Sequence, residues 1–146
     1  MDVVIGMKSK LDEKLIKKLA KEALRMRGLS YAPYSGFNVG AALLASDGTV
    51  YTGCNIENAA YGPSNCAERT AFFKAVSEGA RSFEAICIAG GPAGAKELDH
   101  CPPCGVCRQV MAEFCGKDFE IILARNDNDY KVFTLNELLP ESFSIK

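Results

Sequence analysis

The stretch FEAICIA, residues 83–89, decides the fold class of this 146-residue chain. It is a short and almost uninterrupted apolar run, and the chain breaker GGP, residues 90–92, follows it. Strands that are buried on both faces have such continuous apolar runs, whereas half-exposed strands alternate apolar and polar residues. The stretch therefore predicts a central strand whose sheet is covered on both sides.

Four further strands are predicted around this one. Each is a short segment rich in apolar or β-branched residues and bounded by turn residues. Asp47-Gly48 predicts a hairpin turn between the first two strands, and the polar run 126–129 predicts a turn between the last two. Because each hairpin adds an antiparallel pair, we expect a mixed sheet. The predicted strands are residues 39–45, 49–54, 119–124 and 130–133.

Helical patterns separate these strands. Leucines recur every four residues from Leu11 to Leu19, which indicates an amphipathic helix that ends at Gly28. Ser64 or Asn65 is a candidate cap for a second helix, and Gly79 ends it. The predicted helices are residues 11–27, 66–78, 104–114 and 136–139.

The element order is therefore α-β-β-α-β-α-β-β-α. Apolar strands that alternate with helices predict an α/β fold with helices on both faces of the sheet. We expect a three-layer α-β-α sandwich with a central mixed five-stranded sheet. The chain length suits one hydrophobic core, so residues 1–146 are expected to form a single domain.

Composition excludes several classes of partner. The formal net charge is -1, so the chain lacks the basic field that holds a nucleic-acid polymer. Lysines at positions 8 to 21 are interleaved with acidic residues, which predicts a solvated helix face. No secretory signal is visible, and no apolar run approaches the roughly 20 residues of a membrane span. We therefore expect no membrane partner.

The chain has seven cysteines. An odd number without a secretory signal favours metal binding or buried thiols over a disulfide framework, and it favours a cytoplasmic location. Cys54, Cys87 and Cys115 lie in or beside apolar segments and are expected to be buried fillers. His100, the single histidine, stands in a polar loop, where we expect it to be structural or exposed.

Two short stretches indicate a catalytic metal site. They are Cys66-Ala67-Glu68 and PCGVC, residues 103–107. Thiolates at Cys66, Cys104 and Cys107 can hold zinc and leave a fourth position open. Glu68 is close enough to move the protons of a water without being a ligand. All three thiols are expected at helix amino termini, where the exposed amides favour a thiolate.

Zinc with three thiolates carries a net negative charge, so a site of this kind needs a nearby positive group to balance it. Arg69 lies three residues after Cys66, on the same helical face. We expect Arg69 to donate hydrogen bonds to the ligand sulfurs. The alternative is an ordinary surface arginine.

The cysteine pattern leaves a second ligand set open. Cys101 and Cys104 also have the C-x-x-C spacing, so Cys101 could complete a closed four-cysteine structural site with Cys66, Cys104 and Cys107. In that arrangement Glu68 would have no chemical role. It would then serve only as an acidic residue that favours the first turn of a helix.

At these residues the chain resembles the cytidine deaminases, small zinc-dependent enzymes. The resemblance covers most of the chain, and several motifs in the expected order make it more specific than one zinc pattern. The motifs are YSGFNVGAAL (34–43), GCNIENA (53–59), CAER (66–69) and PCGVCRQ (103–109). Zinc deaminases can hold their metal with three cysteines and use a glutamate that is not a ligand.

The resemblance implies a reaction. One zinc ion per subunit, held by Cys66, Cys104 and Cys107, would activate a water, and Glu68 would carry its proton to the pyrimidine N3 and then help ammonia leave. Cytidine and 2′-deoxycytidine would become uridine and 2′-deoxyuridine, a step of pyrimidine salvage. Carboxylate proton transfer of this kind contributes about 10²–10⁴ in rate.

The resemblance also implies substrate contacts. Asn55 and Glu57 match residues that bind the ribose hydroxyls, and Phe37 matches a ring that packs on the base. Tyr61 falls in a pocket loop. Backbone groups of Ala67 and of the segment before Cys104 would contact the pyrimidine edge.

The tail LLPESF, residues 138–143, resembles a family ending whose phenylalanine enters a neighbouring subunit. This implies a homotetramer with shared active sites, in which Phe143 contacts the substrate of another subunit. An exposed terminal phenylalanine without a partner would be a poor feature in a monomer.

Two other functions compete with cytidine deamination. A related small-molecule aminohydrolase such as a blasticidin S deaminase would share the zinc triad and Glu68, but the pair Asn55 and Glu57 favours a nucleoside. A non-catalytic interaction module with a four-cysteine zinc site belongs to a different class. It would have four sulfur ligands and no open coordination position.

Overall fold

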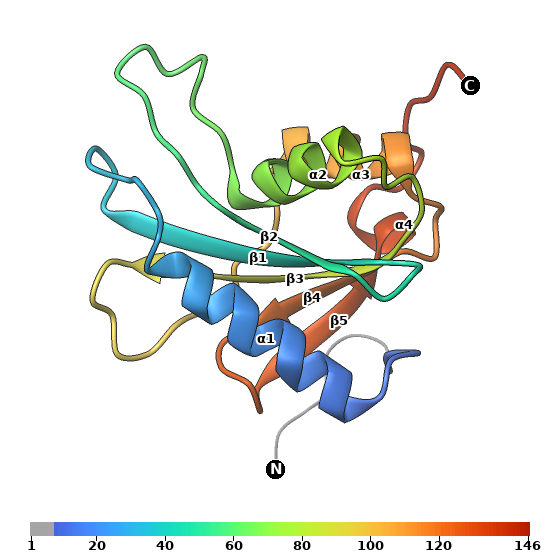
Figure 1. The fold of residues 1–146 in the computed structure, drawn as a ribbon, viewed down its shortest axis with the longest axis horizontal. Coiled ribbons are helices and arrows are strands. Elements are labelled where there is room, and N and C mark those ends of the chain that lie inside the picture. Colours follow the sequence, from blue (N-terminus) through green and yellow to red (C-terminus); the bar gives the residue numbers. More distant parts are fainter. Residues whose placement is uncertain (1–7) are drawn as a thin grey trace.

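The computed structural model describes residues 8–146, and their helices and strands follow the predicted order (Figure 1). Most boundaries agree with the predicted ones to within two residues. The elements are α1 (Glu13–Arg27), β1 (Phe37–Ala45), β2 (Val50–Cys54), α2 (Ala67–Ser77), β3 (Phe83–Pro92), α3 (Gly105–Phe114), β4 (Glu120–Ala124), β5 (Tyr130–Thr134) and α4 (Leu135–Leu138).

The five strands form one mixed sheet in the order β2-β1-β3-β4-β5, with β3 at its centre. The pairs β1–β2, β1–β3 and β4–β5 are antiparallel, and β3–β4 is parallel. Tight turns join the strands of the two hairpins, whereas the parallel pair needs a crossover, which α3 provides. The predicted mixed sheet is confirmed.

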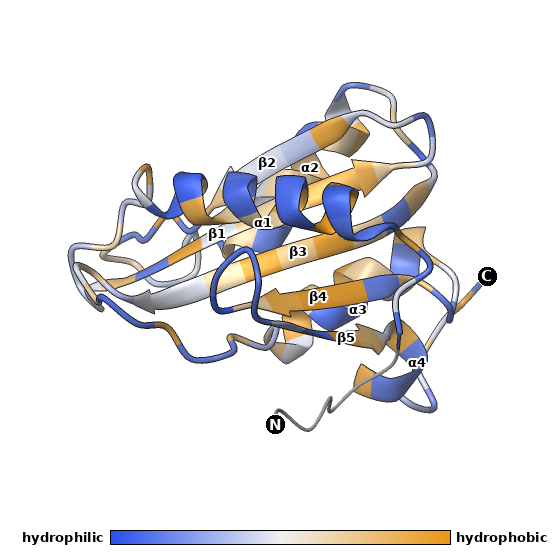
Figure 2. Cartoon of the chain, turned by 90° about the horizontal axis from the view of Figure 1, so that it is seen from below, coloured by the Kyte–Doolittle hydropathy of each residue, from blue (hydrophilic) through white to orange (hydrophobic). Residues whose placement is uncertain are grey.

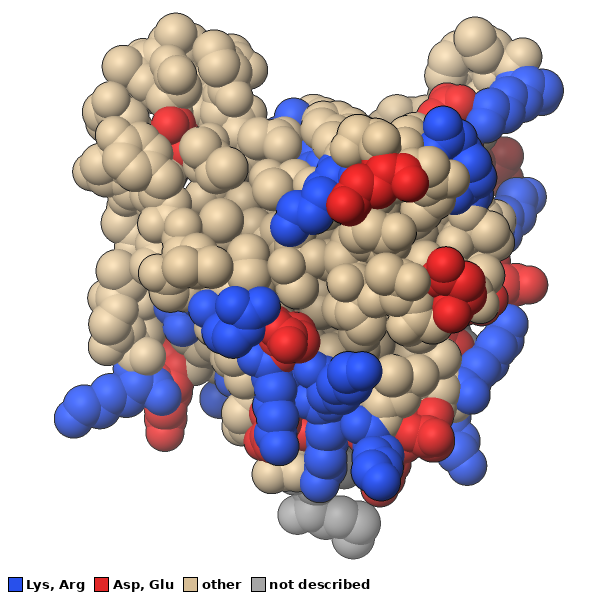
Figure 3. Space-filling view, in the orientation of Figure 1, with Lys and Arg blue, Asp and Glu red and all other residues tan. Residues whose placement is uncertain are grey.

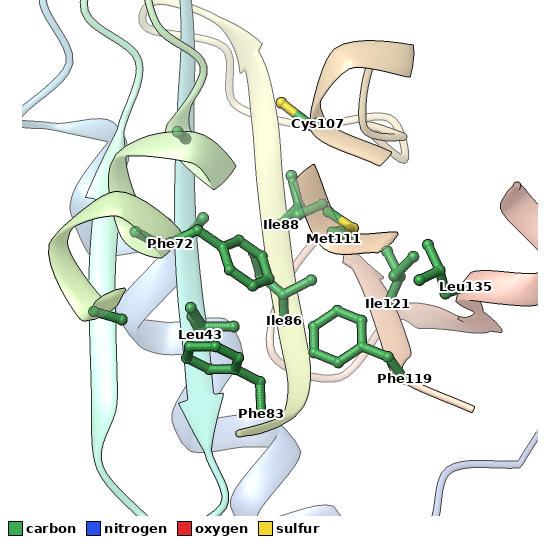
Figure 4. Close-up of a cluster of buried hydrophobic side chains, with 14 of the residues drawn as sticks. Leu43, Phe72, Phe83, Ile86, Ile88, Cys107, Met111, Phe119, Ile121 and Leu135 are labelled. Carbon is green, nitrogen blue, oxygen red and sulfur yellow. The ribbon is translucent and has the colours of Figure 1, made fainter. Parts of the chain in front are cut away.

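Helices cover both faces of the sheet, as the three-layer prediction requires. Helix α1 packs on one face, where Leu19 lies in a core with Ala42 and Ile122 (Figures 1 and 2). Helices α2 and α3 pack on the other face, where Phe72 and Met111 meet the apolar side chains of β3 and β4 (Figure 4). The central strands are apolar on both faces because neither face meets water.

One strand is longer than predicted. Strand β3 does not end at Ala89 but continues through the glycine pair to Pro92. It continues because β1 begins earlier than expected, at Phe37, and pairs with it as far as Phe37↔Pro92 and Val39↔Gly90. The extension makes Phe37 the first residue of β1.

The amino terminus of α2 also differs from the prediction. Its N-cap is Cys66, not Ser64 or Asn65. The Ser64 hydroxyl instead accepts a hydrogen bond from the Asn58 backbone N–H at 2.9 Å. The Asn65 side-chain amide donates to the Thr70 hydroxyl at 3.2 Å. These polar residues therefore order the loop before α2 and leave the cap position to a thiol.

A glycine lets α2 lie directly on the sheet. A Cβ atom on Gly53 of β2 would meet the Ala67 carbonyl oxygen and would lie 2.6 Å from the Ala71 backbone nitrogen. Any side chain at this position would push the helix away from the strand. Gly53 thus fixes how deeply the amino terminus of α2, with Cys66 and Glu68, is seated.

The outer face of α1 carries the lysine cluster. Lys14, Lys17, Lys18 and Lys21 are exposed on this helix, beside acidic side chains (Figure 3). The predicted solvated face is confirmed. Within residues 8–146, no helix combines the length and the apolar character that crossing a membrane requires.

Candidate metal centre and active site

Two helix amino termini supply the three candidate thiols. Cys66 is the N-cap of α2 and Cys104 is the N-cap of α3, both with extended backbone dihedrals. Neither side chain makes a capping hydrogen bond. Cys107 lies in the first turn of α3, where a side chain three residues after the cap faces the cap residue. The predicted placement at helix ends is confirmed, and the two N-cap thiols are left available to a metal.

The sulfur atoms have the spacing of a zinc site. The Sγ atoms of Cys66 and Cys104 are 3.7 Å apart, and those of Cys104 and Cys107 are 3.5 Å apart. All three lie within 4.8 Å of one another. Tetrahedral zinc with Zn–S bonds of about 2.3 Å needs sulfur atoms about 3.8 Å apart. The donor set and its geometry therefore fit zinc.

Arg69 contacts this cluster. Its Nη2 donates to Cys66 Sγ at 3.3 Å, which agrees with the predicted role. Hydrogen bonds from Cys107 and from Arg69 lower the pKa of Cys66 to about 5, although burial opposes the shift. Arg69 Nε is buried and has no hydrogen-bond partner among the described residues 8–146. A cationic donor beside these sulfurs suits a site that carries thiolate charge.

Glu68 is the buried acid of the site. It lies in the first turn of α2 and is 4% exposed. Burial raises its pKa to about 7, and the nearby Cys66 thiolate acts in the same direction. A carboxyl group with this environment can exchange protons near neutral pH, which is the property of a general acid–base group.

The site opens into a cavity of about 270 Å³. Glu68, Cys66 and Cys104 line it together with Arg69 and the predicted substrate contacts Asn55, Glu57 and Ala67. Val39, Ser64, Asn65, Cys101 and Pro102 complete the lining. Most of the predicted site residues thus meet at one cavity, next to the ends of β1 and β2.

Three predicted substrate contacts lie outside this lining. Phe37 is 40% exposed, Tyr61 is 80% exposed and Phe143 is 71% exposed. Tyr61 has a φ of 59°, an uncommon value for a residue other than glycine, and belongs to the loop between β2 and α2, which projects from the sheet (Figure 1). Phe143 lies on the carboxyl-terminal tail. In a single chain these rings are therefore exposed and accessible to a ligand or to another subunit.

Asn55 and Glu57 have a structural role that sequence reasoning missed. Asn55 Oδ1 accepts from the Val39 N–H at 2.9 Å, and its Nδ2 donates to the Phe37 carbonyl at 2.7 Å. Glu57 Oε1 accepts from the N–H groups of Tyr34 and Ser35 at 3.0 and 3.1 Å. Within residues 8–146, no further hydrogen bond is made by the second amide N–H of Asn55 or by the second carboxylate oxygen of Glu57, so each side chain keeps capacity for a ligand.

The remaining thiols and the histidine lie outside the cluster. Cys101 lines the cavity, but within residues 8–146 only Cys66, Cys104 and Cys107 form a ligand group. Burial raises the pKa of Cys101 to about 11 and that of Cys87 to about 12. His100 instead faces Asp129, with Nε2 at 3.7 Å from Oδ1.

Residues 13–123 match the family model of the cytidine and deoxycytidylate deaminase zinc-binding region. The chain belongs to this deaminase family. The cytidine deaminase of Sporosarcina psychrophila is 51% identical over 129 residues, which cover 88% of this chain and 91% of that one. The cytidine deaminase of Halalkalibacterium halodurans is 52% identical over 126 residues, which cover 86% and 92%. The family is named for its zinc-binding region, and that match includes both helix ends described above.

Solved deaminase structures have the same architecture. The crystal structure of cytidine deaminase from Burkholderia pseudomallei superimposes with a TM-score of 0.77 at 45% identity, and covers 86% of this chain and 97% of that one. Cytidine deaminase from Mycobacterium tuberculosis superimposes with a TM-score of 0.73 at 33% identity, and covers 93% and 100%. The cytidine deaminase-like fold is thereby confirmed.

Proposed function

We propose that this protein is a cytidine deaminase that converts cytidine and 2′-deoxycytidine to uridine and 2′-deoxyuridine and releases ammonia, as a step of pyrimidine salvage. The carrying observation is the set of three thiols at zinc spacing beside buried Glu68, in a chain of the deaminase family. Cys66, Cys104 and Cys107 would hold one zinc ion per subunit. When bound, zinc supplies a nucleophile from water near neutral pH.

Glu68 handles the protons of the reaction. It accepts a proton from the attacking water and delivers it to N3 of the pyrimidine. The oxygen of the water adds to C4. Glu68 then takes the remaining proton from the C4 hydroxyl and transfers it to the 4-amino group, the C4–N bond breaks, ammonia leaves and the C4 carbonyl of the uridine product forms. The balance is one water consumed and one ammonia released. Burial of Glu68 keeps solvent from competing for these protons.

The cavity walls provide groups for a nucleoside. Asn55 and Glu57 offer their unused amide hydrogen and carboxylate oxygen to ribose hydroxyls. The backbone of Ala67 and the segment before Cys104 contact the edge of the base. Phe37 and Tyr61, which lie outside the cavity lining of the single chain, would add aromatic contacts to the nucleoside. The chemistry requires no basic groove, which agrees with a net charge of -1.

An absorbance assay on cytidine tests this function. Loss of the 4-amino group should occur with the zinc-loaded protein and stop when a chelator removes the metal. Blasticidin S, assayed in parallel, separates the nucleoside deaminase from the related aminohydrolase. X-ray absorption at the zinc edge that showed four sulfur ligands, together with no turnover of either compound, would favour the non-catalytic zinc module.

Arg69→Ala should lower kcat about tenfold while the protein retains zinc, because outer groups that contact metal ligands contribute about 10–100-fold to affinity or activity. The variant loses the donor to Cys66 but none of the three sulfurs. Arg69→Lys keeps the positive charge but lacks the planar guanidinium, so its kcat should lie between those of the wild type and of Arg69→Ala. Steady-state kinetics with zinc analysis check this result. Wild-type kinetics in Arg69→Ala would show that this arginine is an ordinary surface residue.

A homotetramer with shared active sites is part of the proposal. The supporting feature is a set of large apolar side chains that are exposed in the single chain: Tyr61, Phe73, Val106 and Phe143. Exposed apolar groups of this size mark surfaces that contact another protein. A reducing compartment such as the cytoplasm would keep the seven free cysteines available.

Phe143→Ala should raise KM for cytidine about tenfold, the effect of losing about 1.4 kcal/mol of contact free energy. Light scattering should show a wild-type particle of four times the chain mass. Ile145→Ala is the matched control, because Ile145 is 87% exposed on the same tail but has no expected substrate contact. A fully active wild-type monomer, or an unchanged KM in Phe143→Ala, would contradict the shared site.

A further inference from the structure

Arg108, the residue after Cys107, joins two segments that are far apart in sequence. Its Nε donates to the Pro103 carbonyl oxygen at 2.8 Å. Its Nη1 donates to the Leu138 carbonyl oxygen at 2.6 Å. Among the described residues 8–146, this guanidinium has no carboxylate partner. Both of its hydrogen bonds therefore serve to hold backbone carbonyl groups.

One end of this link is the turn that carries the metal ligand Cys104. Pro103 is fully buried, and its carbonyl belongs to the peptide bond that precedes Cys104. The backbone N–H of Arg108 also donates to the Cys104 carbonyl at 3.0 Å. Arg108 thus holds two consecutive carbonyls of the ligand turn. Since the peptide plane before Cys104 is fixed, the direction in which the Cys104 side chain leaves the backbone is fixed too.

The other end of the link is the final helix and the tail. Leu138 is the last residue of α4, and carbonyls in the last turn of a helix have no partner within the helix. Arg108 supplies that partner. The next side chain, Gln109, donates to the Phe143 carbonyl at 3.1 Å. Two adjacent side chains of α3 therefore hold α4 and the tail that bears Phe143.

We propose that Arg108 is a positioning residue that couples the metal-ligand turn to α4 and the carboxyl-terminal tail, so that metal binding and tail order stabilise each other. Such coupling is reciprocal for binding free energies. An arginine suits the role because its planar guanidinium presents several N–H groups in fixed directions, whereas lysine offers one rotatable ammonium. In terms of the proposed function, on which this inference rests, the ligand turn of one site is linked to the tail expected to serve another.

The test uses zinc affinity and hydrogen exchange, neither of which depends on turnover. Zinc affinity is measured by competition with a chromogenic chelator. Exchange is followed in α4, where the amides of Leu135, Asn136 and Leu139 donate to carbonyl oxygens at 2.8, 3.1 and 2.7 Å. In the wild-type protein, removal of zinc should speed exchange at these amides, because opening of this helix would no longer be opposed by an ordered ligand turn.

Arg108→Ala should bind zinc about tenfold more weakly, within the range for groups that orient metal ligands, and should show faster α4 exchange even when zinc is loaded. Arg108→Lys keeps the charge but can hold only one carbonyl at a time. If the alanine variant does not fold, zinc affinity and α4 exchange in Arg108→Lys test the coupling instead. The matched control is Arg81→Ala, because Arg81 also donates to two backbone carbonyls, those of Val76 and Ala80, both at 2.8 Å, but neither belongs to the ligand turn, to α4 or to the tail.

Unchanged zinc affinity in both Arg108 variants would overturn the coupling. So would wild-type α4 exchange that is the same with and without zinc. These outcomes are independent of whether the protein deaminates cytidine. A wild-type protein without cytidine turnover would end the proposed function, while the zinc and exchange measurements would still decide the role of Arg108.

Discussion

Glu68→Gln should reduce deamination of cytidine by at least about 10²–10⁴-fold, the usual contribution of a positioned carboxyl group to proton transfer. Glutamine has the same shape but can neither accept a proton from the attacking water nor deliver one to N3 and the leaving amine. The three sulfur ligands are untouched, so zinc content should remain that of the wild type. The variant thus separates proton transfer from metal binding.

Stability should not account for this loss. Glu68 is 4% exposed, and burial raises its pKa, which means that the surroundings disfavour its charged form. A neutral amide of equal size fits the same space. Glu120→Gln is the matched control, because Glu120 is also buried, at 2% exposed, but accepts from Ser9 and Lys10 outside the cavity. Its kcat should stay at the wild-type level. A Glu68→Gln protein that turns over at a substantial rate would rule out the acid–base role.

The sheet and its layers could be predicted from sequence because the signals are local. The apolar run 83–89, the two hairpin turns and the helical patterns between the strands together predict the element order, and this order limits the sheet to a few arrangements. The length of β3 could not be predicted this way. Glycine and proline ordinarily end a strand, and only the register with β1 shows that pairing continues to Pro92.

At the site, the residue types showed which hydrogen bonds or chemical steps each side chain can make, but not which groups it contacts in the folded protein. Asn55 was expected to bind a sugar, yet its side chain first bonds the backbone of β1 at Val39 and Phe37. Val39 lines the cavity, but an apolar strand residue looks the same in sequence whether it faces a core or a ligand. Arg108 was visible only as part of a motif. Its link to Leu138 depends on how α3 and α4 pack, which no local pattern reports.

Cys101 shows the same limit for metal ligands. Its spacing from Cys104 allowed a four-cysteine site, but in the structure its side chain lies against β3. A Cβ atom on Gly90 would be 2.8 Å from Cys101 Sγ, so the absence of a side chain there makes room for this thiol. The ligand group found within residues 8–146 contains three sulfurs and leaves Cys101 out.

Cys104→Ala should cost more than about 100-fold in zinc affinity, beyond the 10–100-fold attributed to groups that only orient ligands, and should abolish turnover. Removal of one of three sulfurs leaves too few protein donors for a stable zinc site. Cys104 is the best of the three to test. It is exposed and makes no capping hydrogen bond, so alanine removes little besides the sulfur. Cys107, by contrast, is 1% exposed, and its removal would also leave a cavity in the core.

Cys101→Ala is the matched control for this substitution. It removes a thiol that lines the same cavity and lies three residues before Cys104, but that is not a member of the sulfur cluster. The protein should keep its zinc and its fold, which zinc analysis and circular dichroism would measure. If Cys101→Ala lost zinc as fully as Cys104→Ala, the site would be a closed four-sulfur one, with no position at which water could react. If Cys104→Ala kept zinc and activity, the ligand assignment itself would be wrong.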